Sequence, residues 1–412
     1  MSLVNFKKFI LQIVRRLNRL LLLRSRKIKY IEFKDIEYNS SGYETFFGYH
    51  DITPFSLDNS LVLACRTKGK LISNVSNSNL EIGYYDLSDI NKKFNYLAST
   101  FSWCWQQSCR LQWVPKEDSR IIYNTSNYEN HICRIIDINS KKVINEYNSP
   151  IYSINNNATH YISINFSRLQ RFRPGYGYSD IKDKTINYKA PDNDGLYIVD
   201  FTTGEKELLI SLKEISENNP LSTMREASHY FNHILWSPDS KKFFFLHLWV
   251  WPNGKRFSRA YIYNIVTQKY SILLENGIIS HHCWVDPNKI IIYCGFNDNK
   301  LSYYLFDLEK NNFSTIGHKI LTEDGHPSLS NPRTDLLLTD TYPNKLSEQS
   351  LLIYNIYNNN LYKLASYYHP LSYRNDFRCD LHPRWSNNSK LISIDSAHKG
   401  QRSICIITNP IA

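Results

Sequence analysis

Short apolar runs joined by polar turns recur along most of this chain. A run of apolar residues, a polar turn and a second apolar run occur together seven times. Because two apolar runs around a short polar segment are typical of a β-hairpin, each copy predicts one hairpin. The copies read PFSLDNSLVLA from Pro54, QWVPKEDSRIIYN from Gln112, IYSINNNATHYISIN from Ile151, LWSPDSKKFFFLH from Leu235, CWVDPNKIIIYC from Cys283, SLSNPRTDLLLTD from Ser328 and RWSNNSKLISIDS from Arg384.

A second hairpin pattern follows each copy, and two hairpins make a four-stranded unit. Examples are CRIIDINSKKVI, AYIYNIVTQKYSIL and LLIYNIYNNNLYKLA, and the last unit ends with an incomplete RSICIITN. Seven such units arranged around an axis bury their faces on one another, which lets a long chain remain one domain. The sequence therefore predicts an all-β fold, a seven-bladed β-propeller over residues 31–412. A two-domain β protein is the alternative, but it does not explain seven hairpin pairs in one register.

The third and fourth copies are separated by nearly twice the usual spacing. This predicts an insertion at about residues 166–194, and long insertions in compact domains are commonly functional. The segment supplies Arg168, Arg171 and Arg173 together with Tyr176 and Tyr178. Since arginine binds carboxylates and phosphates in bidentate geometry, we expect these residues to face an anionic substrate across one end of the propeller.

Composition agrees with a folded β protein. Of the 412 residues, 42% are hydrophobic, 21% are charged and 14% are aromatic, which excludes a disordered chain. None of the eight cysteines forms a CxxC pair, so a zinc ribbon is not indicated. The net charge of +11 favours an anionic partner such as an acidic polysaccharide or anionic lipid. Nucleic acid is not expected, because the basic residues are scattered and no reading helix is evident.

The first 30 residues differ from the rest of the chain. Their longest uncharged runs are too short for a transmembrane helix, and a signal peptide with a cleavage site is not recognisable. Apolar residues from Phe9 to Leu21 fall at helical spacing, with Lys and Arg available to a polar face. We expect a basic amphipathic helix that either lies on an anionic membrane surface or packs on the propeller. The expected location is cytoplasmic, with peripheral attachment to the inner membrane.

Polar residues gather just before the first strand of the predicted blades. Because these segments lie near the central axis of a propeller, we expect their side chains to converge at one mouth of the channel. Histidine and carboxylate groups suit a divalent metal or proton transfer. The residues are His50, Asp51, Gln106, Gln107, Arg110, His229, Asn232, His233, His281, His282, Asp324, His326, Arg378, Asp380 and His382.

The chain resembles the oligogalacturonate lyase-like propellers, which cleave uronate glycans by β-elimination with a divalent metal. The segments that carry the resemblance are SHHCWVDPNKIIIY, GHPSLSNPRTDLLLTD and LHPRWSNNSKLISIDSAHKGQ. The resemblance implies that His281 and His382 are metal ligands and that His233 is the base. The segments FFGY, WQQ, RPGYGY, TDTYP and RCDLHPRWS are similar to those of uncharacterised propellers encoded with bacterial surface-polysaccharide genes.

The chain departs from that family at three positions. Asp380 stands where the family has a ligand histidine, and Phe377 stands where it has a ligand glutamine. His326 or Asp324 would then complete the metal shell. The family's carboxylate-neutralising arginine has no counterpart in GLYIVDF, so Arg168 or Arg173 would supply that charge.

The leading hypothesis is a metal-assisted lyase that acts on a uronate-containing bacterial glycan. Manganese, calcium or zinc would be held by His281, His326, Asp380 and His382, with Arg173 neutralising the carboxylate. His233 would remove the proton, and Tyr176 or His229 would assist the leaving oxygen. The expected substrate contacts are Arg168, Arg171, Tyr178, Gln106, Gln107, Arg110, His50, Asp51 and Arg378.

Two other functions remain open. The protein would be a non-catalytic glycan-binding or assembly protein of capsule or lipopolysaccharide synthesis if the site does not turn over. A glycoside hydrolase or glycosyltransferase would need paired carboxylates, for which Asp51, Asp324 and Asp380 are available.

Overall fold

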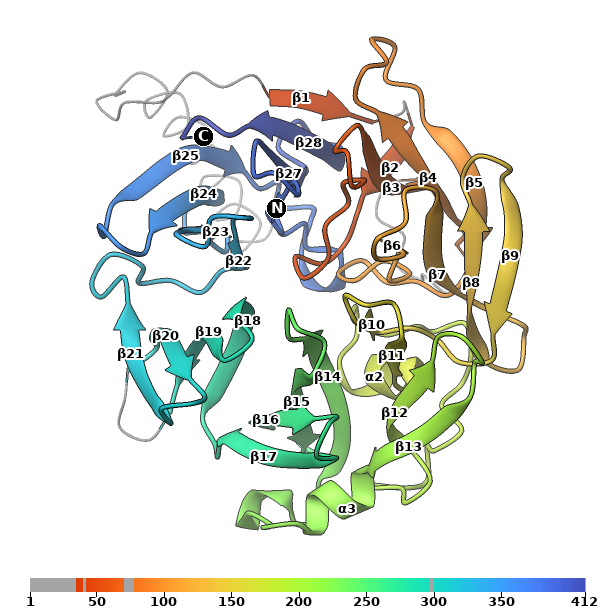
Figure 1. Ribbon diagram of the computed structural model, residues 1–412, viewed down its shortest axis with the longest axis vertical. Helices are drawn as coiled ribbons and strands as arrows, with labels where there is room; N and C mark the ends of the chain where they lie inside the picture. The colour runs from red at the N-terminus through yellow and green to blue at the C-terminus, as the bar shows by residue number, and fades with distance from the viewer. Residues whose placement is uncertain (1–34, 40–41, 70–77, 297–299, 412) are drawn as a thin grey trace, which may run out of the picture.

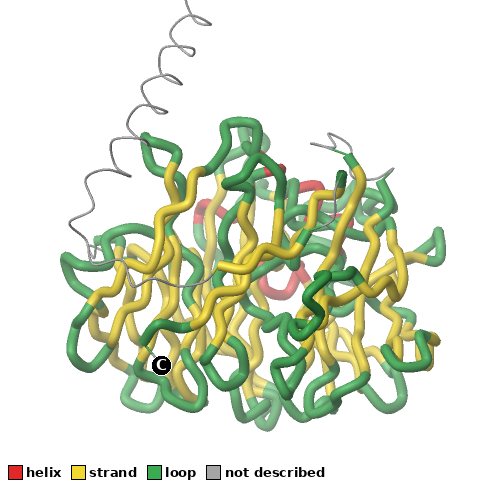
Figure 2. Tube along the Cα trace, turned by 90° about the horizontal axis from the view of Figure 1, so that it is seen from above, coloured by secondary structure: helices red, strands yellow, loops and turns green. Residues whose placement is uncertain are grey.

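The computed structural model describes residues 35–39, 42–69, 78–296 and 300–411. Within these ranges, seven four-stranded antiparallel sheets stand around a common axis (Figure 1). The fold is the predicted seven-bladed β-propeller. Seen from the side, the strands run between two faces on which the connecting loops lie (Figure 2).

The strands of each blade follow one another from the axis outwards. Blade 1 contains β2 (Tyr43–Phe46), β3 (Leu61–Lys68), β4 (Leu80–Asp86) and β5 (Asn95–Thr100). Blade 2 contains β6 (Gln112–Trp113), β7 (Arg120–Ser126), β8 (His131–Asp137) and β9 (Lys142–Tyr147). Blade 3 contains β10 (Ser153–Ile154), β11 (His160–Ser163), β12 (Gly195–Asp200) and β13 (Lys206–Ser211). Blade 4 contains β14 (Ser228–Trp236), β15 (Lys242–Val250), β16 (Arg256–Asn264) and β17 (Lys269–Leu274).

The remaining blades follow the same order. Blade 5 contains β18 (Ile278–Asp286), β19 (Lys289–Gly295), β20 (Ser302–Asp307) and β21 (Asn312–Ile316). Blade 6 contains β22 (Ser328–Leu329), β23 (Leu336–Asp340), β24 (Glu348–Asn355) and β25 (Leu361–Tyr368). Blade 7 contains β26 (Arg384–Trp385), β27 (Leu391–Ser396) and β28 (Ser403–Thr408), and its outer strand is β1 (Asp35–Tyr38).

The pairing of β1 with β28 closes the ring. Glu37 lies opposite Cys405 in this antiparallel pair, so the beginning and the end of the propeller share one sheet. The last sequence unit looked incomplete because its fourth strand comes from the other end of the chain.

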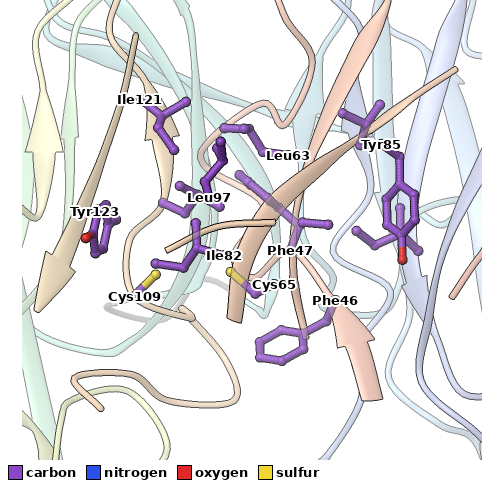
Figure 3. Packing of buried hydrophobic residues seen from close by; sticks show 14 of the residues in the cluster. Phe46, Phe47, Leu63, Cys65, Ile82, Tyr85, Leu97, Cys109, Ile121 and Tyr123 are labelled. Carbon is purple, nitrogen blue, oxygen red and sulfur yellow. The ribbon is translucent and has the colours of Figure 1, made fainter. Parts of the chain in front are cut away.

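The second strand of each blade is packed on both faces by neighbouring blades. This explains why three consecutive leucines begin β23 in place of an alternating pattern, since every residue of that strand is buried. Figure 3 shows one such interface, in which Ile82 and Cys65 of blade 1 face Cys109 and Ile121 of blade 2. All eight cysteines are buried, and none of them forms a disulfide.

In several blades, the turn of the first hairpin contains a serine that is hydrogen-bonded to an aspartate or asparagine two residues later. The Ser56 hydroxyl donates to Asp58 Oδ1 at 2.6 Å, and Ser237 donates to Asp239 Oδ1 at 2.7 Å. These short side chains replace backbone partners in a tight turn, so the polar spacer in the sequence repeat is a structural feature of the blade.

The insertion lies between β11 and β12, beginning with helix α2 (Phe166–Phe172). Asn165 caps this helix by accepting a hydrogen bond from the Arg168 backbone at 2.9 Å. The other helices are α3 (Leu212–Glu217) and two 3₁₀ turns, η2 (Ser222–Met224) and η3 (Asn375–Phe377). None of the helices in the described ranges is long and apolar enough to cross a membrane. The amphipathic helix predicted for residues 1–30 lies outside those ranges.

Candidate functional site

Backbone bulges near the axis direct side chains into the centre of the ring. His233 and His382 have positive φ values of 56° and 43°, and the ladder of β14 shifts register between Asn232 and Leu235. Such angles are uncommon for residues with a Cβ and change the direction of the side chain. The bulge at His233 and the positive φ of His382 therefore turn these two side chains out of the direction that a regular strand would give them.

Three buried side chains form a group with the spacing of metal ligands. One ligand atom from each of His326, Asp380 and His382 lies within 4.8 Å of the other two. His281 belongs to the same cluster, because its ring centre is 4.2 Å from that of His326. We call His281, His326, Asp380 and His382 the metal-ligand arc, and they come from blades 5 to 7.

The histidines of this arc are oriented by bonds to their Nδ1 atoms. His382 Nδ1 donates to the Gly48 carbonyl at 2.7 Å, and His326 Nδ1 bonds with the two oxygens of Asp340 at 2.8 and 3.0 Å. Among the described residues, Nε2 of His326 and Nε2 of His382 have no hydrogen-bond partner although both are buried. An imidazole bonded through Nδ1 with a bare Nε2 is the usual arrangement of a metal-binding histidine.

Asp340 holds the backbone of two members of the arc as well. Its carboxylate accepts from the His326 amide at 2.7 Å and from the His382 amide at 3.2 Å. His281 Nδ1 is bonded to Asp324 at 3.1 Å, and Asp324 also accepts from the Ser280 hydroxyl at 2.6 Å. The ligand positions are thus fixed by a surrounding layer of carboxylates.

Electrostatics around the arc favour a neutral His382 next to an ionised Asp380. Burial and the nearby His326 lower the pKa of His382 well below its usual value. Burial alone would raise the pKa of Asp380, but the charge of Arg378 and its hydrogen bond, at 2.6 Å, lower it. His326 is the exception, because Asp340 and Asp380 outweigh its burial and raise its pKa. Bare imidazole nitrogens and a carboxylate fit a divalent metal.

His233 lies beside this arc and is hydrogen-bonded to Tyr49. The Tyr49 hydroxyl is 3.2 Å from His233 Nδ1, and the His233 amide donates to the Tyr152 hydroxyl at 2.9 Å. Burial and the nearby His281 and His282 lower the pKa of His233 well below its usual value. Its side chain is only half-buried, so His233 is a neutral imidazole that a bound molecule can reach.

A second set of polar groups lines the other part of the channel wall. Arg110 donates to both oxygens of Asp51 at 3.1 and 2.9 Å, and to the Tyr152 carbonyl at 2.8 Å. Gln107 Nε2 donates to the Tyr152 hydroxyl and to Asn232 Oδ1, at 3.2 and 3.3 Å. We call Asp51, Gln107, Arg110, Tyr152 and Asn232 the hydrogen-bonded arc, and they come from blades 1 to 4.

His50 and Gln106 lie between the two arcs and bond to backbone carbonyls. His50 Nδ1 donates to the Pro327 carbonyl at 3.1 Å, and its ring centre is 5.3 Å from that of His326. Gln106 Nε2 donates to the Arg378 carbonyl at 3.0 Å. Arg378 itself is partly exposed above the Tyr342 ring, at 4.7 Å from its centre.

The insertion brings two of its five predicted residues to the cluster. The Tyr176 ring centre is 6.0 Å from that of His233 and 6.1 Å from that of Tyr49. The Arg173 guanidinium lies 4.9 Å from the centre of the Tyr176 ring. Arg110, Arg171 and Arg378 each pair with a carboxylate, whereas Arg173 forms no ion pair within the described residues.

The other residues predicted from the insertion have partners of their own. Arg168 is buried and donates to the carbonyls of His229, Tyr188 and Lys189. Arg171 pairs with Asp183 at 3.1 Å. The Tyr178 ring stacks on Phe166 with centres 4.3 Å apart. The structure does not bring these three side chains to the cluster. Arg168 ties the insertion to β14 of blade 4, whereas Arg171 and Tyr178 contact other residues of the insertion.

His229 also lies apart from the cluster. Its Nδ1 is 2.8 Å from His247 Nε2, and its Nε2 donates to the Met224 carbonyl. The pKa of His229 is lowered to about 4 by burial. His229 precedes His233 by four residues of β14, so the strand carries its side chain away from the level of the metal-ligand arc.

Tyr49, Tyr152, Asp340 and Tyr342 also lie in the two arcs or beside them, although the sequence patterns did not indicate them. Tyr49 is central, with its ring centre 5.0 Å from that of His382 and 5.5 Å from that of His233. Asp340 and Tyr342 both belong to TDTYP. The polar Asp340 at the end of the apolar run LLLTD was the available signal, because a buried carboxylate needs partners.

Comparisons with known proteins agree with the fold. No protein-family model and no curated protein matches the chain. An oligogalacturonate lyase in complex with manganese has a TM-score of 0.63 and 15% identity, over 91% of this chain and 96% of that chain. An oligogalacturonate lyase from Vibrio parahaemolyticus has a TM-score of 0.60 and 14% identity, over the same shares. Kuenenia stuttgartiensis hydrazine synthase has a TM-score of 0.50 and 9% identity, over 89% of this chain and 96% of that chain. The chain is thus a seven-bladed β-propeller with the fold of the oligogalacturonate lyases.

Proposed function

We propose that the protein is a metal-assisted polysaccharide lyase that cleaves a uronate-containing glycan by β-elimination. The observation that carries the proposal is the position of His233, a half-buried imidazole whose ring centre is 6.2 Å from that of His281 and 6.0 Å from that of Tyr176, the ring that faces Arg173. The reaction needs a base for the proton beside the carboxyl group and positive charge to stabilise the resulting anion.

The metal-ligand arc fits a divalent cation. His281, His326 and His382 offer imidazole nitrogens and Asp380 offers a carboxylate oxygen, a donor set better suited to manganese or zinc than to calcium. A bound metal would polarise the substrate carboxylate as a Lewis acid. The similarity in fold to a lyase in complex with manganese supports manganese as the cation.

The chain's own residues supply the remaining parts. Arg173 is free of carboxylate partners within the described residues, so its guanidinium is available to the carboxylate of the sugar. His233 accepts the proton from the carbon next to that carboxylate. Neither role requires Arg168 or His229, whose polar atoms are bonded elsewhere.

A glycosidase mechanism fits the site less well. Asp51 is paired with Arg110, Asp380 is paired with Arg378, and Asp324 is bonded to His281 and Ser280. A hydrolase needs one carboxyl group that is protonated and another that is free to act on water or on the sugar. Each of these three carboxylates already has a side-chain partner, and none is shown as a protonated acid.

The proposal is tested with the full chain, manganese and a panel of uronate oligosaccharides. We expect a C4=C5 unsaturated product, seen by ultraviolet absorbance and mass spectrometry. His233→Ala should lower kcat by about 10²- to 10⁴-fold without a change in unfolding temperature, whereas exposed His318→Ala should have no effect. An active His233→Ala protein would remove His233 as the base. Binding without cleavage by the wild type would favour the glycan-binding alternative.

We also propose that the basic N-terminal segment binds an anionic membrane surface. Residues 1–34 contain ten of the 49 Lys and Arg residues but only one of the 38 Asp and Glu residues, and so carry nine of the 11 net positive charges. The full chain should co-sediment with vesicles that contain anionic lipid. The Arg15→Glu, Arg16→Glu, Arg19→Glu variant should stay in solution, and equal sedimentation of the two proteins would contradict the proposal.

A further inference from the structure

His50 is a buried histidine of blade 1 that lies against the metal-ligand arc. Its ring centre is 5.3 Å from that of His326, 5.6 Å from that of His281 and 6.4 Å from that of His382. His233 also lies beside the arc, but among its three histidines it has a ring contact with His281, at 6.2 Å. Of the two histidines next to the arc, His50 is therefore the one that lies near all of its imidazoles.

The hydrogen bond of His50 determines which of its nitrogens can bind a metal. Nδ1 is 3.1 Å from the Pro327 carbonyl, and because a carbonyl can only accept, Nδ1 carries a proton. The neutral imidazole then has its lone pair on Nε2, with which no described residue forms a hydrogen bond. His326 and His382 are arranged in the same way, with a bonded Nδ1 and a bare Nε2.

Backbone carbonyls hold blade 1 beside the arc. Pro327, which accepts from His50, directly follows His326. The Gly48 carbonyl, two residues before His50, accepts from His382 Nδ1 at 2.7 Å. The chain around His50 is thus bonded to two segments of the arc, and these bonds fix the position of its ring.

The ring distances allow the four imidazoles to share one cation. A histidine nitrogen bound to zinc lies about 2.1 Å from the metal, so the ring centre is about 3.2 Å from it, and two such rings are at most about 6.4 Å apart. The distances from His50 to the three histidines of the arc do not exceed this limit.

Asp324 is the other group near the arc that could complete the set of ligands. Its two oxygens are bonded to His281 Nδ1 at 3.1 Å and to the Ser280 hydroxyl at 2.6 Å. Asp324 therefore lies on the Nδ1 side of His281, away from the nitrogen that can bind the metal, and orients the ring.

We propose that His50 is a further ligand of the cation held by the metal-ligand arc and that it binds through Nε2. The inference rests on the proposed function and gives His50 the role of a metal ligand in place of a substrate contact. Four imidazoles and the Asp380 carboxylate would then hold the cation, from blade 1 as well as from blades 5 to 7. A set of donors so rich in nitrogen favours manganese or zinc over calcium.

Two amide substitutions separate metal binding from hydrogen bonding at His50. The amide of His50→Asn can replace Nδ1–H and bond to Pro327, but it offers nothing at the position of Nε2. His50→Gln can place an amide oxygen near that position. We expect the manganese affinity of the full chain to fall by about 10- to 100-fold in His50→Asn and by less in His50→Gln, measured by isothermal titration calorimetry.

Equal unfolding temperatures of the metal-free wild type and His50→Asn would show that the fold is intact. An unchanged affinity in His50→Asn would overturn the inference and leave the lyase function standing. A loss in His50→Gln with none in His50→Asn would also overturn it, because His50 would then act only by holding Pro327.

Copper-loaded protein gives a direct count of the imidazole ligands, since Cu²⁺ binds such sites tightly. Pulsed electron paramagnetic resonance detects the remote nitrogen of each coordinated imidazole. We expect one coordinated imidazole fewer in His50→Asn than in the wild type, and the same number as in the wild type in His233→Asn, the matched control beside the arc. An equal number in His50→Asn and the wild type would overturn the ligand assignment. A wild type that binds neither manganese nor copper would overturn the metal-assisted function as well.

Discussion

The two arcs of the channel wall occupy equivalent places in successive blades but differ in what their side chains have left to bind. In the hydrogen-bonded arc, Asp51 and Arg110 satisfy each other, and Tyr152 both accepts from His233 and donates to Asn232. In the metal-ligand arc, Nε2 of His326 and Nε2 of His382 have no partner among the described residues. Both arcs gather polar groups near the axis. Only the metal-ligand arc has buried nitrogen atoms without a hydrogen-bond partner among the described residues, and these atoms can bind a ligand.

The largest expected effect on stability distinguishes the Asp51–Arg110 pair from the Asp380–Arg378 pair. Arg110 is fully buried, so Asp51→Ala leaves a buried charge unpaired and should lower the free energy of unfolding by about 3–5 kcal/mol. Arg378 is 31% exposed and can be solvated, so Asp380→Ala should cost much less stability but should remove a metal ligand. Urea unfolding and metal content measure the two effects. Equal destabilisation by both variants would contradict the distinction.

A smaller effect is expected at Asp340, which orients the metal-ligand arc without belonging to it. Asp340→Asn keeps the shape of the side chain but weakens its bonds to His326 Nδ1 and to two backbone amides. We expect a 10- to 100-fold loss of manganese affinity, measured by isothermal titration calorimetry. Asp137→Asn, in a surface turn, is the control. Unchanged affinity would mean that Asp340 serves only the fold.

The smallest effect concerns histidines outside both arcs. Burial lowers the pKa of His229 and of His369 to about 4, below the usual value of 6.5. The unfolded chain therefore binds protons first as the pH falls, so stability is fully present above pH 6.5 and is lost toward pH 4. Urea unfolding at pH 7 and pH 5 should show this decrease, and His229→Leu should make it smaller. A free energy of unfolding that does not vary over this range would contradict the neutral state of His229.

The sequence was sufficient for the fold because every blade repeats one local pattern. Seven hairpin pairs, several of them with a Ser-Asp or Ser-Asn turn in the first hairpin, leave few alternatives to a closed ring. The closing strand β1 escaped prediction, because its pairing with β28 depends on contact between the two ends of the propeller. A four-residue strand has no pattern of its own.

Part of the site could be predicted from the sequence because the blades repeat. The rule that residues before the first strand face the axis found His281, His326, Asp380 and His382. It gave the same weight to His229, because a sequence does not show that one strand carries His229 and His233 to different levels of the channel. It missed Tyr49, because the hydroxyl of this residue is hydrogen-bonded to His233, which lies 184 positions further along the chain.

Metal content of the purified, untagged full chain tests the central claim most directly. Elemental mass spectrometry should find about one equivalent of manganese or zinc in the wild type and none in His326→Ala/His382→Ala. A wild-type protein that holds no metal after incubation with manganese and zinc, or a double variant that retains its metal, would contradict the assignment of the metal-ligand arc.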